Sequence, residues 1–292
     1  MRDVRIEALI DRPLTLAEGP VWDERDGVLW FVDVVEQLVV RLDPATRAIR
    51  EFAMPAQIGS LGLAAGNRLV VALRNGIHLF DPRSGDLEFL VHPEPLPITN
   101  RLNDGKVGPD GNFWVGSLDD RPDRQPVGAL YRITPEGEAT RIAGGVRCSN
   151  GLAWSPDGRA MYHADSTSGS VRVFDFDPGT GSAINPRPLI TLCRDEGLPD
   201  GAAVDVDGFY WSAGVTAGVI NRISPSGAIV DRIVVPVSAP TMPCFGGPDL
   251  KTLYVTSLAS PRSGQQQAGT VIAFDVDVAG VRIGRFGEPA AP

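Results

Sequence analysis

Short stretches in which apolar and polar residues alternate run along the whole chain, and turn sequences separate them. The segments EGPVWDERDGVLWFVD (18–33) and LVVRLDPAT (38–46) show the pattern, with β-branched and aromatic residues on both sides of a turn. Alternation with a period of two residues is typical of β-strands, and Asp-Gly or Pro-x-x-Gly units are typical of the turns between them. No stretch has a helical period, so the pattern predicts an all-β protein.

The strand pattern occurs six times. Strong copies lie at 18–33, 103–117, 150–165 and 200–214, and weaker ones at 60–73 and 244–257. Aligned on Trp30, Val70, Trp114, Tyr162, Trp211 and Tyr254, successive copies are 40, 44, 48, 49 and 43 residues apart. A second strand-forming piece follows each copy, at 38–46, 76–85, 128–137, 170–181, 218–227 and 269–280. A repeat of about 40–50 residues that holds several strands is typical of a β-propeller blade.

These repeats predict a six-bladed β-propeller that forms a single domain over residues 1–292. We expect the end segments VRIEAL (4–9) and VRIGRF (281–286) to pair and close the ring, because closure removes exposed sheet edges. The alternative architecture is an interrupted pair of β-sandwiches, which would not explain six nearly equal repeats.

Polar residues recur where each first strand begins. In a propeller the innermost strands run along the central channel, so their opening residues meet at one end of the axis. On this alignment the opening residues are Glu18, Ser60, Asn103, Asn150, Asp200 and Cys244. Four of the six are carboxylates or carboxamides, at positions where packing alone favours apolar side chains. We expect Cys244 simply to pack, and His163 to be a core histidine with a structural partner.

Converging carboxylates repel one another unless a positive charge lies between them. Glu18, Asn150 and Asp200 present only oxygen ligands, which suits Ca²⁺, Mg²⁺ or Mn²⁺, and the lack of histidine argues against a dedicated zinc site. Such residues also cap turns, but their recurrence in equivalent places favours a metal. We therefore expect one divalent ion at one end of the channel.

The stretch NRLNDGK (100–106) adds Arg101 beside Asn103. A guanidinium presents a planar fork of donors that suits a carboxylate or sugar hydroxyls. We expect the loops that join second to third strands to share the metal's face, the longest being 118–128 and 258–269. Loops on a rigid scaffold commonly carry specificity.

Composition narrows the partners. The net charge of −9 argues against a nucleic-acid partner, which requires a basic face. No apolar run reaches the roughly 18 residues that span a bilayer, and the first residues lack a signal-peptide pattern. The three cysteines lie far apart without CxxC spacing, as expected of reduced thiols. We expect a cytoplasmic protein, a monomer or small homo-oligomer, without a membrane partner.

The strong repeats LAEGPVWDERDGVLWFVD, NRLNDGKVGPDGNFWVGS, SNGLAWSPDGRAMYHADS and LPDGAAVDVDGFYWSA resemble the senescence marker protein, regucalcin and gluconolactonase family of six-bladed propellers. CFGGPDLKTLYVTS is similar in particular to the bacterial sugar-acid lactonases of that family, such as xylonolactonases and arabinonolactonases. The resemblance implies hydrolysis of aldonolactones with one divalent metal, which is calcium, zinc, manganese or ferrous iron in different members. It assigns Glu18, Asn150 and Asp200 to the metal, and Arg101 and Asn103 to the substrate. It also implies an acidic substrate contact within GSLDDRP, at Asp119 or Asp120.

We accordingly expect hydrolysis of a sugar lactone to the open-chain aldonic acid. The metal would polarise the carbonyl, and Asp200 would act as general base. No GxSxG motif is present, which argues against a serine nucleophile. The alternatives are a calcium-dependent phosphotriesterase or paraoxonase-like esterase on the same scaffold, and a non-enzymatic calcium-binding propeller.

Overall fold

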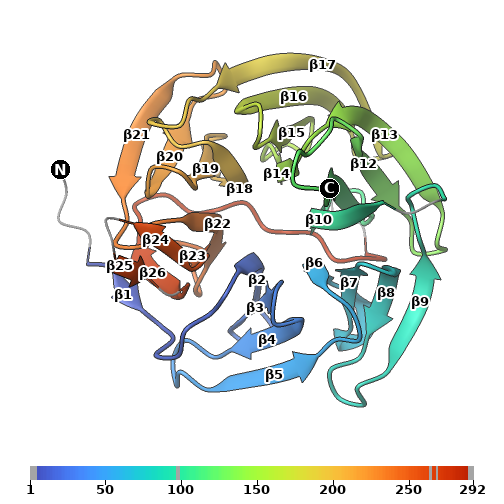
Figure 1. Ribbon diagram of the computed structural model, residues 1–292, viewed down its shortest axis with the longest axis horizontal. Helices are drawn as coiled ribbons and strands as arrows, with labels where there is room; N and C mark the ends of the chain where they lie inside the picture. Colours follow the sequence, from blue (N-terminus) through green and yellow to red (C-terminus); the bar gives the residue numbers. More distant parts are fainter. Residues whose placement is uncertain (1–4, 97–98, 263–264, 268, 289–292) are drawn as a thin grey trace.

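Six four-stranded antiparallel sheets surround a common axis in the computed structural model of the chain (Figure 1). The structure describes residues 5–96, 99–262, 265–267 and 269–288. Within these ranges the one helical segment is the short 3-10 helix η1 (Ala65–Asn67). The predicted six-bladed β-propeller is confirmed.

Each blade is built from the axis outward. The innermost strands are β2 (Ala17–Asp23), β6 (Ile58–Leu63), β10 (Asn100–Val107), β14 (Ser149–Trp154), β18 (Pro199–Val204) and β22 (Pro240–Gly246). The second strands are β3 (Val28–Asp33), β7 (Leu69–Leu73), β11 (Phe113–Asp119), β15 (Ala160–Asp165), β19 (Tyr210–Gly214) and β23 (Thr252–Ser257). The third strands are β4 (Leu38–Leu42), β8 (Gly76–Phe80), β12 (Gly128–Ile133), β16 (Ser170–Asp177), β20 (Val219–Ile223) and β26 (Val271–Asp275). The outermost strands are β5 (Ile49–Ala53), β9 (Leu87–Val91), β13 (Ala139–Val146), β17 (Ser182–Thr191), β21 (Ile229–Val234) and β1 (Glu7–Ala8).

Burial decreases from the axis to the rim. Every residue of β3, β7, β11 and β19 is buried, whereas β5 is almost wholly exposed. The apolar core is divided into six clusters, each shared by two neighbouring blades. The second strands are apolar on both faces because each blade packs against a neighbour on either side, which explains why their alternation is weak in the sequence.

Ring closure differs from the expectation. The strand β1 pairs with β26, with Glu7 opposite Ala273, so the start of the chain provides the outermost strand of the last blade. Residue 4 of the expected end strand lies outside the described residues. The expected pairing of 4–9 with 281–286 is wrong, because 281–286 forms no strand and instead crosses the axis (Figure 1). The edge of β26 is thus paired with a strand from the other end of the chain.

The segment 280–288 lies across the end of the axis where the innermost strands finish. The amide of Val281 donates to the Val204 carbonyl at 2.9 Å, and that of Phe286 to the Leu63 carbonyl at 2.8 Å. A Cβ at Gly284 would lie only 2.4 Å from the Gly108 carbonyl oxygen, so glycine allows this close crossing. The segment borders a cavity of about 780 Å³ that includes Lys106 and Trp154. We call the opposite end, where the innermost strands begin, the upper face.

The described residues contain no helix long and apolar enough to cross a membrane. A cytoplasmic location stays a prediction.

Candidate functional site

A β-bulge interrupts the pairing of innermost and second strands near the upper face in all six blades. The irregularities fall at Glu18/Val21, Ile58/Ser60, Leu102/Gly105, Asn150/Ala153, Pro199/Ala202 and Pro240/Met242. A bulge re-aims side chains, and a glycine next to it accepts the left-handed backbone. Gly19 and Gly151, which follow Glu18 and Asn150, have φ values of 56° and 64°. The Glu-Gly and Asn-Gly pairs of the sequence are therefore the local reason for the bulges in these two blades.

The bulges bring three acidic side chains into one electrostatic environment. Asp200 and Asp104 are 8% and 5% exposed. Burial raises the pKa of Asp200 to about 8, and the negative charge of Asp104 adds to this. Burial likewise raises the pKa of Glu18 well above its ordinary value, and the negative charges of Asp200 and Asp104 raise it further. Ionising such a cluster is unfavourable unless a cation joins it.

Few donors compensate for these carboxylates. Glu18 accepts a hydrogen bond of 3.3 Å from the Gly19 amide, and Asp104 accepts one of 3.2 Å from the Leu152 amide. Within the described part of the chain, no hydrogen bond reaches the Asp200 carboxylate, and one Asp104 oxygen is buried without a partner. Buried acids with so few donors are typical of a site that holds a positive ion.

A chain of hydrogen bonds orients the amide and guanidinium groups beside the acids. Arg101 Nη1 donates to Asn103 Oδ1 at 2.9 Å, and Asn103 Nδ2 donates to Asn150 Oδ1 at 3.0 Å. Asn150 Nδ2 in turn donates to Ser166 Oγ at 2.7 Å. Because the guanidinium of Arg101 can only donate, the chain of hydrogen bonds that starts there fixes which end of each carboxamide is the oxygen. The Asn150 oxygen keeps one lone pair for a further ligand. Arg101, Asn103 and Asn150 thus form one polar wall.

The donor set fits a hard divalent cation. Glu18 and Asp200 offer carboxylate oxygens and Asn150 offers an amide oxygen, which are the ligand types that such ions accept. The described residues contain no group of three or more His, Cys, Asp or Glu side chains able to hold a metal. A metal at this place would therefore depend on the Asn150 oxygen as well as on the two carboxylates.

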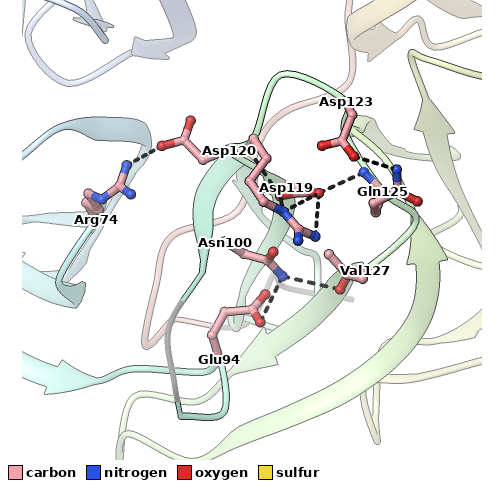
Figure 2. A network of polar contacts seen from close by, with 9 residues as sticks. Arg74, Glu94, Asn100, Asp119, Asp120, Asp123, Gln125 and Val127 are labelled. Carbon is pink, nitrogen blue, oxygen red and sulfur yellow. Dashed lines mark hydrogen bonds and ion pairs between the residues drawn. The ribbon is translucent and has the colours of Figure 1, made fainter.

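The structure separates the two aspartates after β11. Asp119 is fully buried and accepts hydrogen bonds from Arg121 Nε at 2.8 Å and from the Gln125 amide at 2.7 Å, so it anchors the β11–β12 loop (Figure 2). Asp120 points the other way and pairs with Arg74 (Figure 2). Its other oxygen lies 3.5 Å from Arg101 Nε. Of the two predicted contacts, Asp120 is the one that touches the polar wall.

We predict that substitutions of the two aspartates affect different properties, substrate binding for Asp120 and loop stability for Asp119. Asp120→Ala frees Arg101, and we expect a three- to tenfold higher KM for D-glucono-1,5-lactone with kcat within about twofold, as for a loss of uniform binding. Asp119→Ala removes the loop anchor, and we expect about tenfold faster cleavage of residues 120–127 in limited proteolysis. Steady-state kinetics and proteolysis on both variants check this. Equal kinetic effects with unchanged proteolysis would contradict the division of roles.

One of the aligned opening positions, Cys244, proves different from the others. Cys244 pairs with Tyr254, as Val21 pairs with Trp30, so it lies deeper along the axis than the bulge. Its place among the opening residues is wrong, because β22 bulges at Thr241 and the alignment is shifted there. Cys244 is buried in the cluster shared by the first and last blades, as expected of a packing residue.

The other polar positions hold the site's surroundings together. Ser60 Oγ donates to the Asn103 carbonyl at 2.7 Å, which braces the backbone of the polar wall. His163 Nε2 lies 2.7 Å from Ser149 Oγ in the buried part of its blade, and burial lowers its pKa to about 4. The expectation of a core histidine with a structural partner is confirmed.

Sequence reasoning missed several residues around the upper face. Asp104 directly follows Asn103, so the paired polar residues in LNDGK were an available signal. Cys148 lies next to the site, with its sulfur 3.6 Å from Asn150 Nδ2. Arg74 comes from the β7–β8 turn and Arg124 from the β11–β12 loop, and no local pattern connects these two with the acids. The second expected rim loop, 258–269, forms the ribbon β24 (Ser260–Arg262) and β25 (Gln265–Gln267), and its residues 263, 264 and 268 lie outside the described residues.

The fold and the site define a six-bladed β-propeller with an oxygen-rich acidic cluster and an arginine–asparagine wall at one end of its axis. The chain belongs to the SMP-30/Gluconolactonase/LRE-like family, whose model matches residues 16–259. It is 38% identical to the 6-deoxy-6-sulfogluconolactonase of Pseudomonas putida, over 94% of this chain and 96% of that one. It is 35% identical to the regucalcin of Xenopus laevis, over 88% of each chain. The solved structure of a calcium-binding protein, regucalcin, from Agrobacterium tumefaciens is similar with a TM-score of 0.90 and 25% identity, over 97% of each chain.

Proposed function

We propose that this chain hydrolyses the ester bond of a sugar lactone to the open-chain acid. It is then an enzyme of the carboxylic-ester hydrolase class, with a small polyhydroxylated lactone as substrate. The observation that carries the proposal is the meeting of Glu18, Asn150 and Asp200 beside Arg101 and Asn103 on the upper face. The name of the Pseudomonas putida relative, a lactonase at 38% identity, supports the same reaction.

Glu18, Asn150 and Asp200 would hold one divalent ion, which supplies Lewis-acid polarisation of the lactone carbonyl when bound. The raised pKa values of the two carboxylates support this assignment, because a cation is what would keep both ionised. The name of the Agrobacterium protein speaks of calcium binding by that protein. Ca²⁺, Mg²⁺, Mn²⁺, Zn²⁺ and Fe²⁺ are the ions to be compared here.

The chain's own residues would bind the lactone and move the proton. Arg101 and Asn103 orient the ring hydroxyls by hydrogen bonds, which is a positioning role. Asp200 takes a proton from the attacking water as the new C–O bond forms. When the ring C–O bond breaks, the same carboxyl returns the proton to the departing ring oxygen. A carboxylate near a cation is a weak base, which is sufficient for an activated ester and much less so for an amide.

A panel of substrates and metals tests the proposal. Purified protein is stripped with a chelator and reloaded with each of the five ions. It is then assayed on aldono-1,4- and 1,5-lactones, on 6-deoxy-6-sulfogluconolactone and on an organophosphate triester. We expect lactone hydrolysis that falls at least tenfold on chelation and returns with one or more ions.

Other outcomes of the panel separate the alternatives. Turnover of the triester without lactone turnover would favour the phosphotriesterase-like alternative. Metal binding without any turnover would favour a calcium-binding propeller. Full lactonase activity in the metal-stripped protein would contradict the role given to the ion.

A further inference from the structure

Arg124 is a partly buried arginine in the otherwise exposed loop between β11 and β12. Its backbone adopts a positive φ of 36°, and its amide donates to the Arg121 carbonyl at 3.1 Å. In the part of the chain that the structure describes, no acceptor pairs with its guanidinium. An arginine that is held in a tight turn, partly desolvated and left without an acceptor has its donors free for a ligand.

Hydrogen bonds to Asp119 and a contact between Asp120 and Arg101 hold the loop that carries Arg124. Asp119 binds the amides of Arg121 and Gln125 at 3.1 and 2.7 Å, so the turn around Arg124 is held by a buried carboxylate (Figure 2). Asp120, from the same loop, contacts Arg101. The loop therefore presents residue 124 to the upper face from a rigid base.

The charge of Arg124 acts on groups from three separate elements. Burial raises the pKa of Asp200, and Arg124 and then Arg101 partly offset this effect. Burial raises the pKa of the Cys148 thiol to about 12, and Arg124 again offsets part of it. Arg124 also disfavours the charged form of Arg101 itself. Its guanidinium is therefore close enough to Asp200, Cys148 and Arg101 for its charge to act on all three.

The charged side chains around Arg124 on the upper face would leave an excess of positive charge if the bound ligand were neutral. A divalent ion would offset the carboxylates of Glu18 and Asp200, and the positive charge of Lys106 acts on the third acid, Asp104. Asp120 is shared by two arginines, Arg74 and Arg101, which leaves one positive charge. Arg124 adds a second. Two unpaired positive charges beside a bound neutral lactone would be unfavourable, whereas an anionic group would satisfy them.

We propose that Arg124, with Arg101 and Arg74, recognises an anionic group carried by the lactone, a carboxylate or a sulfonate. This inference rests on the proposed lactonase function. A guanidinium binds either group through two parallel hydrogen bonds, which lysine cannot reproduce. Arg124 is then a specificity-determining residue, and the substrate class is the acidic sugar lactones.

Two lactones that differ in one group test the inference. D-Glucono-1,4-lactone ends in CH₂OH and D-glucaro-1,4-lactone ends in a carboxylate. We expect kcat/KM to be at least tenfold higher for the glucarolactone in the wild type. Arg124→Gln should lower it by about 10- to 100-fold for the glucarolactone, as for a lost charge-assisted hydrogen bond, and by less than threefold for the gluconolactone. Arg124→Lys should restore part of the loss. Arg83→Gln, an exposed arginine in the β8–β9 turn, is the matched control.

Equal losses on both lactones, or no loss in Arg124→Gln, would overturn the inference. Calorimetric binding of D-glucarate and D-gluconate to the metal-loaded protein gives a second readout that needs no turnover. If neither lactone is hydrolysed, the proposed function fails. The inference about Arg124 then stands only if the wild type binds glucarate at least tenfold more tightly than gluconate and Arg124→Gln removes that difference. Equal affinities would reject it.

Discussion

We expect Asp200→Asn to lower kcat/KM for the lactone by about 10³-fold or more. The variant keeps the size of the side chain but removes the proposed proton acceptor, and general-base help is typically worth ~10²–10⁴-fold. It also removes one of two charged ligands from the proposed metal set, so weaker metal binding adds to the loss. Steady-state kinetics at saturating metal measures the first effect separately from the second.

The control for this variant lies on the same hairpin. Asp207 lies in the turn between β18 and β19, at the other end of β18 from Asp200, and its side chain is 62% exposed. Asp207→Asn should therefore keep wild-type activity. Asp200→Asn should fold at least as well as the metal-free wild type, because an amide in that buried place has no charge to bury. An active Asp200→Asn enzyme would remove Asp200 from the mechanism. An unfolded one would contradict the account of its environment.

The second large effect is a metal-dependent stability that grows with pH. In the metal-free protein the pKa of Asp200 is raised from 3.8 to about 8. Between these values the folded state holds a proton that the unfolded state lacks, so this group's contribution to stability is lost as pH rises. A divalent ion binds the ionised carboxylates and releases the proton, so its affinity increases up to about pH 8 and then levels off.

Thermal unfolding with metal and with chelator, between pH 5 and 9, measures this effect. At a metal concentration of about 100 times Kd, the gain is roughly 2.7 kcal/mol, or about 4–5 °C in Tm. We expect the gain to be small near pH 5 and full above pH 8, and Asp207→Asn to behave like the wild type. In Asp200→Asn most of the gain and its pH dependence should vanish. A gain that is independent of pH, or that shrinks as pH rises, would contradict the assignment.

The recurrence of one strand pattern was sufficient to predict the propeller. Six copies of similar length must stack as equivalent blades, since each copy alone leaves both faces of its sheet apolar. The same recurrence pointed to the opening residues, because equivalent positions in equivalent blades lie at similar depth. It failed at Cys244, where a shorter bulge in β22 shifts the register. It also failed for the last strand, because two end segments of similar alternation gave no sign that only one of them pairs.

The sequence by itself determined the number of blades, their order and the polar character of the residues that meet on the axis, because these depend on local periodicity. Only the tertiary structure decided which side chains act together. Asp119 and Asp120 are neighbours in the chain, yet one anchors a loop and the other reaches Arg101 and Arg74. Arg74 and Arg124 come from different blades, so no sequence spacing relates them to Asp200. The contact of Arg74 with Asp120 and the effect of Arg124 on Asp200 depend on how neighbouring blades are arranged around the closed ring, which no single segment of the sequence records.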